Sequence, residues 1–164
     1  MEDIDIVGLE AERDALFAAA QTILMAAPGA DGIPEMGVSP VVWYAGEMFI
    51  YPSRLSAHVR ALLKAKRATF LVIEDEDRAQ NIWARKRIKF NSELSEIDRK
   101  NEIFDAVCDA FASRHGPTME LIRDFTDFHL LRLRPTGGVM VLGFAKAYQL
   151  VGPDLAVKAH LRQS

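Results

Sequence analysis

The sequence predicts a small α+β barrel that is mainly β, with antiparallel strands and a few interspersed helices. Most of the chain alternates between runs rich in Val, Ile, Trp, Tyr and Phe and short clusters of turn residues, which is typical of consecutive strands. Helical spacing of apolar residues appears only in separate stretches. The 164 residues match the usual size of one domain, so we expect a single domain over 1–164.

The first half of the chain is expected to form a helix, three strands, a second helix and a fourth strand. Residues 8–20 carry apolar side chains on one helical face and acidic residues in the first turns. In 21–53, the turn sequences "PGADG" and "AGE" separate three antiparallel strands. Helical spacing returns over 53–67, and 68–73 form a buried strand that runs into an acidic loop.

The next two elements are an alternating basic strand and the longest helix. Residues 81–93 alternate apolar and basic side chains, which indicates a strand. Residues 94–116 have helical spacing, with Ser95 as the expected N-cap and Gly116 as the expected stop.

The last part of the chain is expected to contain two short helices and a hairpin. A helix over 118–124 precedes two strands in 125–150 that are joined at the turn sequence "RPTGG". The final helix is expected over 153–161, because Pro153 suits the first helical turn.

Composition indicates a soluble protein of a reducing cytoplasm. The net charge of −3 does not favour nucleic acid or an anionic membrane as a partner. The single cysteine, Cys108, cannot form an internal disulfide and is expected to be a core thiol. No stretch is long and apolar enough to span a bilayer, and the acidic start does not resemble a signal peptide.

Several kinds of site are excluded by their missing motifs. None of the four histidines has another at i, i+4, and the chain has neither an HExxH motif nor a pair of cysteines, which excludes a structural zinc site. The glycine fingerprints of P-loops and Rossmann domains are absent as well. No Ser-His-Asp arrangement is evident.

Three groups of polar residues are candidates for binding, and each has a structural alternative. In "WARKRIKF", Arg85 and Arg87 share a face with Trp83, which suits a carboxylate or phosphate on an apolar ligand, or simply a solvated sheet face. "SRLSAHVRALL" places hydroxyls, a histidine and arginines at a helix start, which suits an anion or a helix cap. Asp127 begins a strand, where it would orient a histidine or a water, or serve as a turn residue.

Four segments resemble the haem-utilisation (HutZ/HugZ-like) family: "SRLSAHVRALLKAKRATFLVIEDED", "WARKRIKF", "DFTDFHLLRLRP" and "GFAKAYQLVGPDL" with the following "HL". The likeness extends over 22–160. That family belongs to the FMN-binding split-barrel superfamily, which includes pyridoxamine 5'-phosphate oxidase. The resemblance therefore implies a six-stranded antiparallel split β-barrel with flanking helices.

The resemblance also implies a homodimer that binds haem at the subunit interface, and in characterised members the haem can be opened oxidatively. Asp127 matches the aspartate that hydrogen-bonds to the axial histidine of the partner. Arg85 and Arg87 are then expected at the haem propionates.

The axial histidine itself does not carry over. His160 matches another family histidine, in the "HL" of the last element, and the axial ligand normally follows a few residues later, past Ser164. We therefore expect His160 to belong to a packed tail. Its recruitment as the iron ligand is the alternative.

Two other functions remain open from the sequence. The first is an FMN-dependent oxidoreductase with Ser56, His58 and Arg60 near the phosphate, although the early strand lacks the basic residues that such enzymes use. The second is a haem carrier without catalysis. The sequence does not decide whether the chain is an enzyme. If it is one, the candidates are a haem-degrading oxygenase and an FMN-dependent oxidoreductase.

Overall fold

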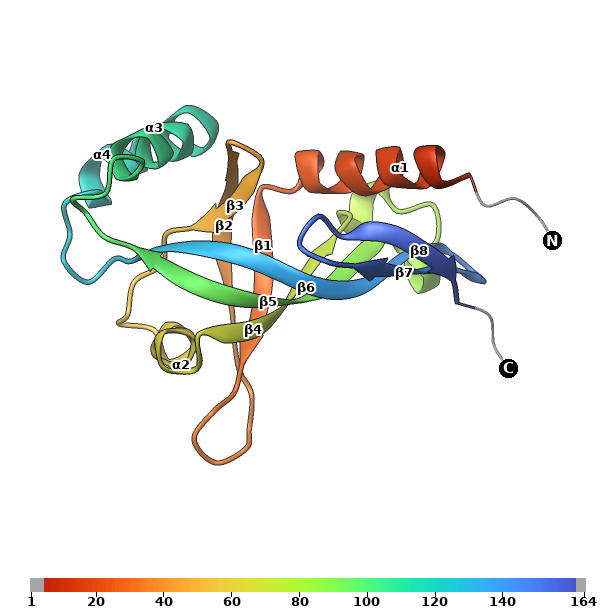
Figure 1. Cartoon of the computed structure of the whole chain (residues 1–164), viewed down its shortest axis with the longest axis horizontal. Helices are drawn as coiled ribbons and strands as arrows, with labels where there is room; N and C mark the ends of the chain where they lie inside the picture. The colour runs from red at the N-terminus through yellow and green to blue at the C-terminus, as the bar shows by residue number, and fades with distance from the viewer. Residues whose placement is uncertain (1–4, 162–164) are drawn as a thin grey trace. The chain divides into compact units, whose positions relative to one another are not determined.

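The computed structural model describes residues 5–161 and contains the predicted split barrel (Figure 1). The strands neighbour one another in the order β3-β2-β1-β4-β5-β6-β7-β8, and β3 also pairs with β6. This extra pairing closes six antiparallel strands into a barrel, to which β7 and β8 are added. The elements are α1 (Ile6–Ala19), β1 (Thr22–Ala27), β2 (Glu35–Tyr44), β3 (Glu47–Ile50), α2 (Ala57–Ala65), β4 (Arg67–Ile73), β5 (Arg87–Ile97), α3 (Phe104–His115), α4 (Thr118–Ile122), β6 (Leu130–Gly143), β7 (Lys146–Val151) and β8 (Ala156–His160), with short 3₁₀ turns at Glu76–Arg78 and Ile82–Ala84.

Residue contacts divide the chain into two compact units. Of the described residues, the first unit holds 5–20, 69–91 and 135–161, and the second holds 21–68 and 92–134. The expectation of a single domain stays a prediction. No helix among residues 5–161 has the length and apolar character needed to cross a membrane.

The core of the second unit is aromatic and lies between its strands and α3. Tyr51 packs against Phe104, Phe111 and Phe128, with ring centroids 5.4 to 6.4 Å apart. Cys108 on α3 is fully buried in this cluster, which confirms the expected core thiol. Helix α4 contacts α3 (Figure 1).

The first unit is built around Phe90 of β5. Its ring stacks on Phe70 of β4 at 5.5 Å and meets the edge of Phe17 of α1 at 5.9 Å. Asp5 caps the start of α1 by accepting a hydrogen bond from the Gly8 amide at 2.9 Å. The predicted first helix, the three strands after it, the second helix and the fourth strand are all confirmed.

The predicted longest helix over 94–116 is wrong in its first part. Residues up to Ile97 extend β5, so Ser95 lies within a strand and caps nothing. The side chains of Asp98 and Asn101 accept hydrogen bonds from the amides two residues ahead, and these Asx turns separate the strand from α3. The helix is confirmed over Phe104–His115, as is its stop at Gly116, which has a φ of 89°. With 12 residues, α3 is shorter than the 14-residue α1.

The predicted hairpin turn at "RPTGG" is wrong, because β6 continues through it. A Cβ on Gly138 would lie 2.3 Å from the Lys89 carbonyl oxygen, so this glycine allows two backbones to approach closely. The turn follows at Phe144 and Ala145, where Ala145 adopts a φ of 56°.

The predicted final helix is also wrong, because Ala156–His160 form strand β8. The turn before it spans 152–155, and β8 pairs with β7 in an antiparallel register that joins Val151 to Ala156. Val157 is buried and Lys158 is exposed, so the short run follows the two-residue period of a strand.

Candidate functional site

The candidate aspartate lies where two segments of the second unit pair with each other. Ser53 and Phe128 form an isolated antiparallel bridge. The Ser53 hydroxyl donates a hydrogen bond to the Asp127 carboxylate, and the Arg54 amide donates to the Asp127 carbonyl at 2.8 Å. Asp127 is half-buried, so its carboxylate is anchored and still reachable from solvent. It therefore sits beside the residues that lead into α2.

The start of α2 carries the other three candidates of this unit. Ser56 is the N-cap but its side chain caps no amide. Arg60 is exposed, and its Nη1 donates to the carbonyls of Arg54 at 3.0 Å and Leu55 at 2.7 Å. Arg60 thus stabilises the loop that precedes its own helix. For this arginine, the structural alternative to anion binding, a local contact at the helix start, is the one that the structure shows.

His58 lies directly on the backbone of β2. A Cβ on Gly37 would be 2.3 Å from the His58 ring, so only glycine permits the imidazole to lie there. Within residues 5–161, no hydrogen bond to the ring of His58 is found. Nε2 is among the ring atoms that pack against Gly37.

A cavity of about 540 Å³ lies between α2 and the β1–β2 connection. Its lining includes Pro28, Gly29, Glu35, Ala57, Arg60 and Lys64. Helix α2 contributes small side chains and two cations to it, and the first residue of β2, Glu35, contributes one carboxylate. Two cations and one carboxylate suit an acidic group of a ligand better than a metal cation.

In the first unit, the basic segment is a strand only from Arg87 onward. Trp83 is 83% exposed in a 3₁₀ turn, so the predicted shared face of Trp83, Arg85 and Arg87 on one strand is wrong. The strand does not begin here because the Asn81 side chain accepts a hydrogen bond from the Trp83 amide at 3.0 Å, which starts a turn.

The two arginines differ in how far they are engaged. Arg85 donates twice to the Glu74 carbonyl and pairs with Glu76 at 3.4 Å. Arg87 donates from Nη1 to the Arg85 carbonyl at 3.0 Å. Arg87 has more donors left for a ligand, although its role there remains a prediction.

His160 ends β8, and its ring is packed. Its Nε2 lies 2.7 Å from the Ala145 carbonyl oxygen, and its ring centroid lies 5.1 Å from that of Tyr148. Nε2 is therefore a donor to the backbone, and iron ligation through it would break this hydrogen bond. The expected family histidine beyond Ser164 falls outside the described residues.

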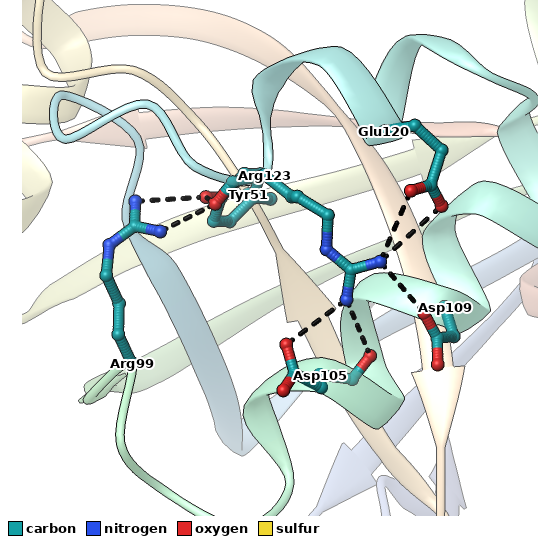
Figure 2. Close-up of polar contacts among 6 residues, drawn as sticks. All are labelled: Tyr51, Arg99, Asp105, Asp109, Glu120 and Arg123. Atoms are coloured by element: carbon teal, nitrogen blue, oxygen red, sulfur yellow. Dashed lines mark hydrogen bonds and ion pairs between the residues drawn. The ribbon is translucent and has the colours of Figure 1, made fainter.

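Sequence reasoning missed a set of charged side chains around the Asp127 segment. Arg123 is 18% exposed and pairs with Asp109 at 3.0 Å, Asp105 at 3.2 Å and Glu120 at 3.5 Å (Figure 2). These carboxylates raise the pKa of Arg123, with its hydrogen bond to Asp109 as the largest cause. The partners come from α3 and α4, so no local motif announces them.

The same region holds two groups whose pKa is raised by burial. Removal from water raises the pKa of the Cys108 thiol to about 11. It also raises the pKa of Tyr51, against a smaller opposing effect of the Arg99 hydrogen bond. Both groups are therefore neutral in the folded protein at ordinary pH.

A second cavity, of about 600 Å³, lies beside the Asp127 segment. Arg99, Phe104, Thr126, Phe128 and His129 contribute to its lining. The His129 Nδ1 lies 2.6 Å from Glu96 Oε1, and its buried Nε2 has no hydrogen-bond partner among the described residues. Within residues 5–161, no three His, Cys, Asp or Glu side chains gather into a metal-binding group.

Comparison with known proteins points to one group of relatives. The chain is 32% identical over 143 residues to heme oxygenase HutZ of Vibrio cholerae, which covers 87% of this chain and 81% of HutZ. Its structure matches ChuZ of Campylobacter jejuni with a TM-score of 0.85 and 26% identity, over 94% of this chain and 63% of ChuZ. It matches a structure of V. cholerae HutZ, described as a heme storage protein, with a TM-score of 0.74 and 27% identity, over 89% of this chain and 98% of that one.

More distant structures share the fold alone. One from Clostridium acetobutylicum, described as belonging to the pyridoxinephosphate oxidase family, has a TM-score of 0.65 at 13% identity, over 90% of this chain and 96% of that one. No protein-family model matches the chain.

Proposed function

Because the chain belongs to the HutZ-like family of the FMN-binding split-barrel superfamily, we propose that it binds haem in a pocket at the interface of a homodimer. The observation that carries this proposal is the 32% identity to HutZ over 87% of the chain. The anchored carboxylate of Asp127 also supports it, because Asp127 matches the family aspartate that hydrogen-bonds to the iron-binding histidine. We expect the protein to act in the cytoplasm.

In this proposal, residues of the chain would hold the haem and orient the imidazole that binds its iron. Asp127 would accept a hydrogen bond from the imidazole that binds the iron, and Ser53 would keep the carboxylate oriented. Arg87, with donors left over, is the better of the two predicted clamps for a propionate. His160 would bind iron through Nε2 only after giving up its hydrogen bond to the backbone.

An apolar face of the β1–β2 ladder supports self-association. In the pairing of these strands, Leu24 lies opposite Val38 and Ala26 opposite Met36, so their side chains share one side of the ladder. Met36 is 66% exposed and Val38 is 58% exposed. Large apolar side chains gathered on an exposed sheet face are typical of an interface, and we propose a second copy of this chain as the partner.

The bound haem would supply the iron at which oxygen chemistry takes place. The two descriptions of HutZ, as an oxygenase and as a storage protein, correspond to two versions of the proposal. We favour binding as the shared property and treat haem degradation as the activity to be tested. The flavin alternative predicts FMN binding through Ser56, His58 and Arg60.

Titration of the purified protein with haemin and, separately, with FMN distinguishes these functions. We expect a saturable Soret band with haemin and no quenching of FMN fluorescence. The Asp127→Asn variant should bind haemin with an altered Soret band, whereas Asp124→Asn, at an exposed aspartate three residues away, should behave as the wild type. Stoichiometric FMN binding without a haemin complex would contradict the proposal.

Loss of the Soret band in the presence of a reductant and oxygen, with iron released, would identify an oxygenase. A stable Soret band under the same conditions would identify a carrier.

A further inference from the structure

Arg99 follows β5 and contacts the segment that carries Asp127. Its Nη1 donates to the Arg123 carbonyl at 2.6 Å. Its Nη2 is directed at the carbonyls of Phe125 and Phe128, the latter at 3.3 Å, and at the Tyr51 hydroxyl at 3.2 Å. Figure 2 shows the guanidinium pointing at Tyr51 and the backbone of Arg123. One guanidinium therefore binds two carbonyls that precede Asp127 in the chain and one that follows it.

The guanidinium of Arg99, at an exposed position, stabilises the convergence of these carbonyls. Their oxygens are partial negative charges brought to one place, and without a donor they would repel one another and need solvation by water. The Tyr51 hydroxyl also donates to the Arg123 carbonyl at 2.8 Å, and the Phe128 amide donates to the Phe125 carbonyl at 3.3 Å. Within residues 5–161, only Arg99 donates to all three carbonyls. The guanidinium is itself placed over the ring of Phe104, 5.2 Å from its centroid.

The opposite side of the same segment is held by the residues that lead to α2. The Arg54 amide donates to the Asp127 carbonyl, and the His129 amide donates to the Pro52 carbonyl at 3.0 Å. Together with the Ser53–Asp127 hydrogen bond, these contacts fix the direction of the carboxylate.

We propose that Arg99 is a positioning residue for Asp127: it holds the turn of 123–128 in the one conformation in which the Asp127 carboxylate meets Ser53. What that carboxylate does for haem rests on the function proposed above. Lysine would not replace Arg99, because an ammonium lacks the planar fork that serves several acceptors at once.

The test combines amide exchange without haem with a double-mutant cycle on haemin affinity. In Arg99→Gln, the Arg54 and His129 amides should exchange about tenfold faster or more, because their acceptor contacts open with the turn. Haemin should bind about three- to tenfold more weakly, and Arg99→Lys should restore only part of the loss. On the Asp127→Asn background, Arg99→Gln should have no further effect on haemin affinity.

Arg67→Gln is the matched control, because Arg67 is an exposed arginine of the same unit with no side-chain hydrogen bond or ion pair found within residues 5–161. Unchanged amide exchange in Arg99→Gln would overturn the proposal, as would an equal loss of haemin affinity with and without Asp127. If the wild type does not bind haemin, the proposed function fails, and the exchange measurement still decides the role of Arg99. If Arg99→Gln does not fold, the same measurements on Arg99→Lys decide it.

Discussion

The imidazole of His58 lies so close to Gly37 that a Cβ on this glycine would be 2.3 Å from the ring. A histidine from the start of α2 is thus seated on β2 by the absence of a side chain. Both residues belong to the second unit, together with Ser53 and Asp127. The packing of α2 on β2 therefore includes a steric match between these two residues that can be tested directly.

Gly37→Ala should lower the free energy of unfolding by about 1 to 3 kcal/mol, because the new methyl group overlaps with the His58 ring. Urea denaturation measures the loss. Adding His58→Ala removes the overlap, so Gly37→Ala should cost little in that background. Equal costs in both backgrounds would show that the ring does not occupy this position.

Arg123→Gln should lower the free energy of unfolding by about 1 to 2 kcal/mol, because a guanidinium that is only 18% exposed loses its hydrogen bonds to three carboxylates of α3 and α4. These carboxylates are 58% to 84% exposed, so solvent screens each pair. The control is Lys86→Gln, which removes an ion pair with Glu12 in which both side chains are 40% to 46% exposed. That exposed pair should contribute less than about 1 kcal/mol. Equal losses in urea denaturation would contradict the special role of Arg123.

The stability of the protein should fall between about pH 9 and about pH 11, because burial raises the pKa of Cys108 from 9.0 to about 11. The thiol stays neutral in the folded chain and loses its proton first in the unfolded chain, so rising pH favours unfolding. The loss attributable to Cys108 is about 3 kcal/mol at most.

Urea denaturation at pH 8 and pH 11 should therefore show a larger decline for the wild type than for Cys108→Ala. The variant keeps Tyr51, whose raised pKa acts in the same direction, so the difference isolates the thiol. A parallel decline of the two proteins would refute the assignment.

His160→Ala should destabilise the fold by about 1 kcal/mol and leave haemin affinity unchanged, because its ring is engaged with Ala145 and Tyr148. Thermal unfolding and a haemin titration measure the two quantities. A shifted Soret band in the variant would make His160 an iron ligand instead.

Local sequence patterns predicted those elements whose formation depends on neighbouring residues alone. The first helix and the stop at Gly116 depend on apolar spacing and on one glycine in the left-handed region. Gly138 misled the sequence reading, because its role is the close approach of another strand rather than a turn. The five residues of β8 are too few to separate a strand period from a helical one.

The contacts of the candidate site join residues far apart in the chain, so local patterns did not predict them. The position of Asp127 at a strand start and the family resemblance both predicted it as a candidate, but its partner Ser53 lies 74 residues away in the chain. Arg99 reaches carbonyls 24, 26 and 29 residues ahead, and no spacing in the sequence indicates such contacts. Only the closed barrel brings these segments together.

Sedimentation velocity of the haemin-loaded protein, followed at the Soret band, tests the central claim most directly. The account predicts that the haem absorbance moves with a species of twice the chain mass, and that dilution into monomers releases the haem. Haem that moves with a monomer, or that remains free of the protein, would contradict a haem pocket at a homodimer interface.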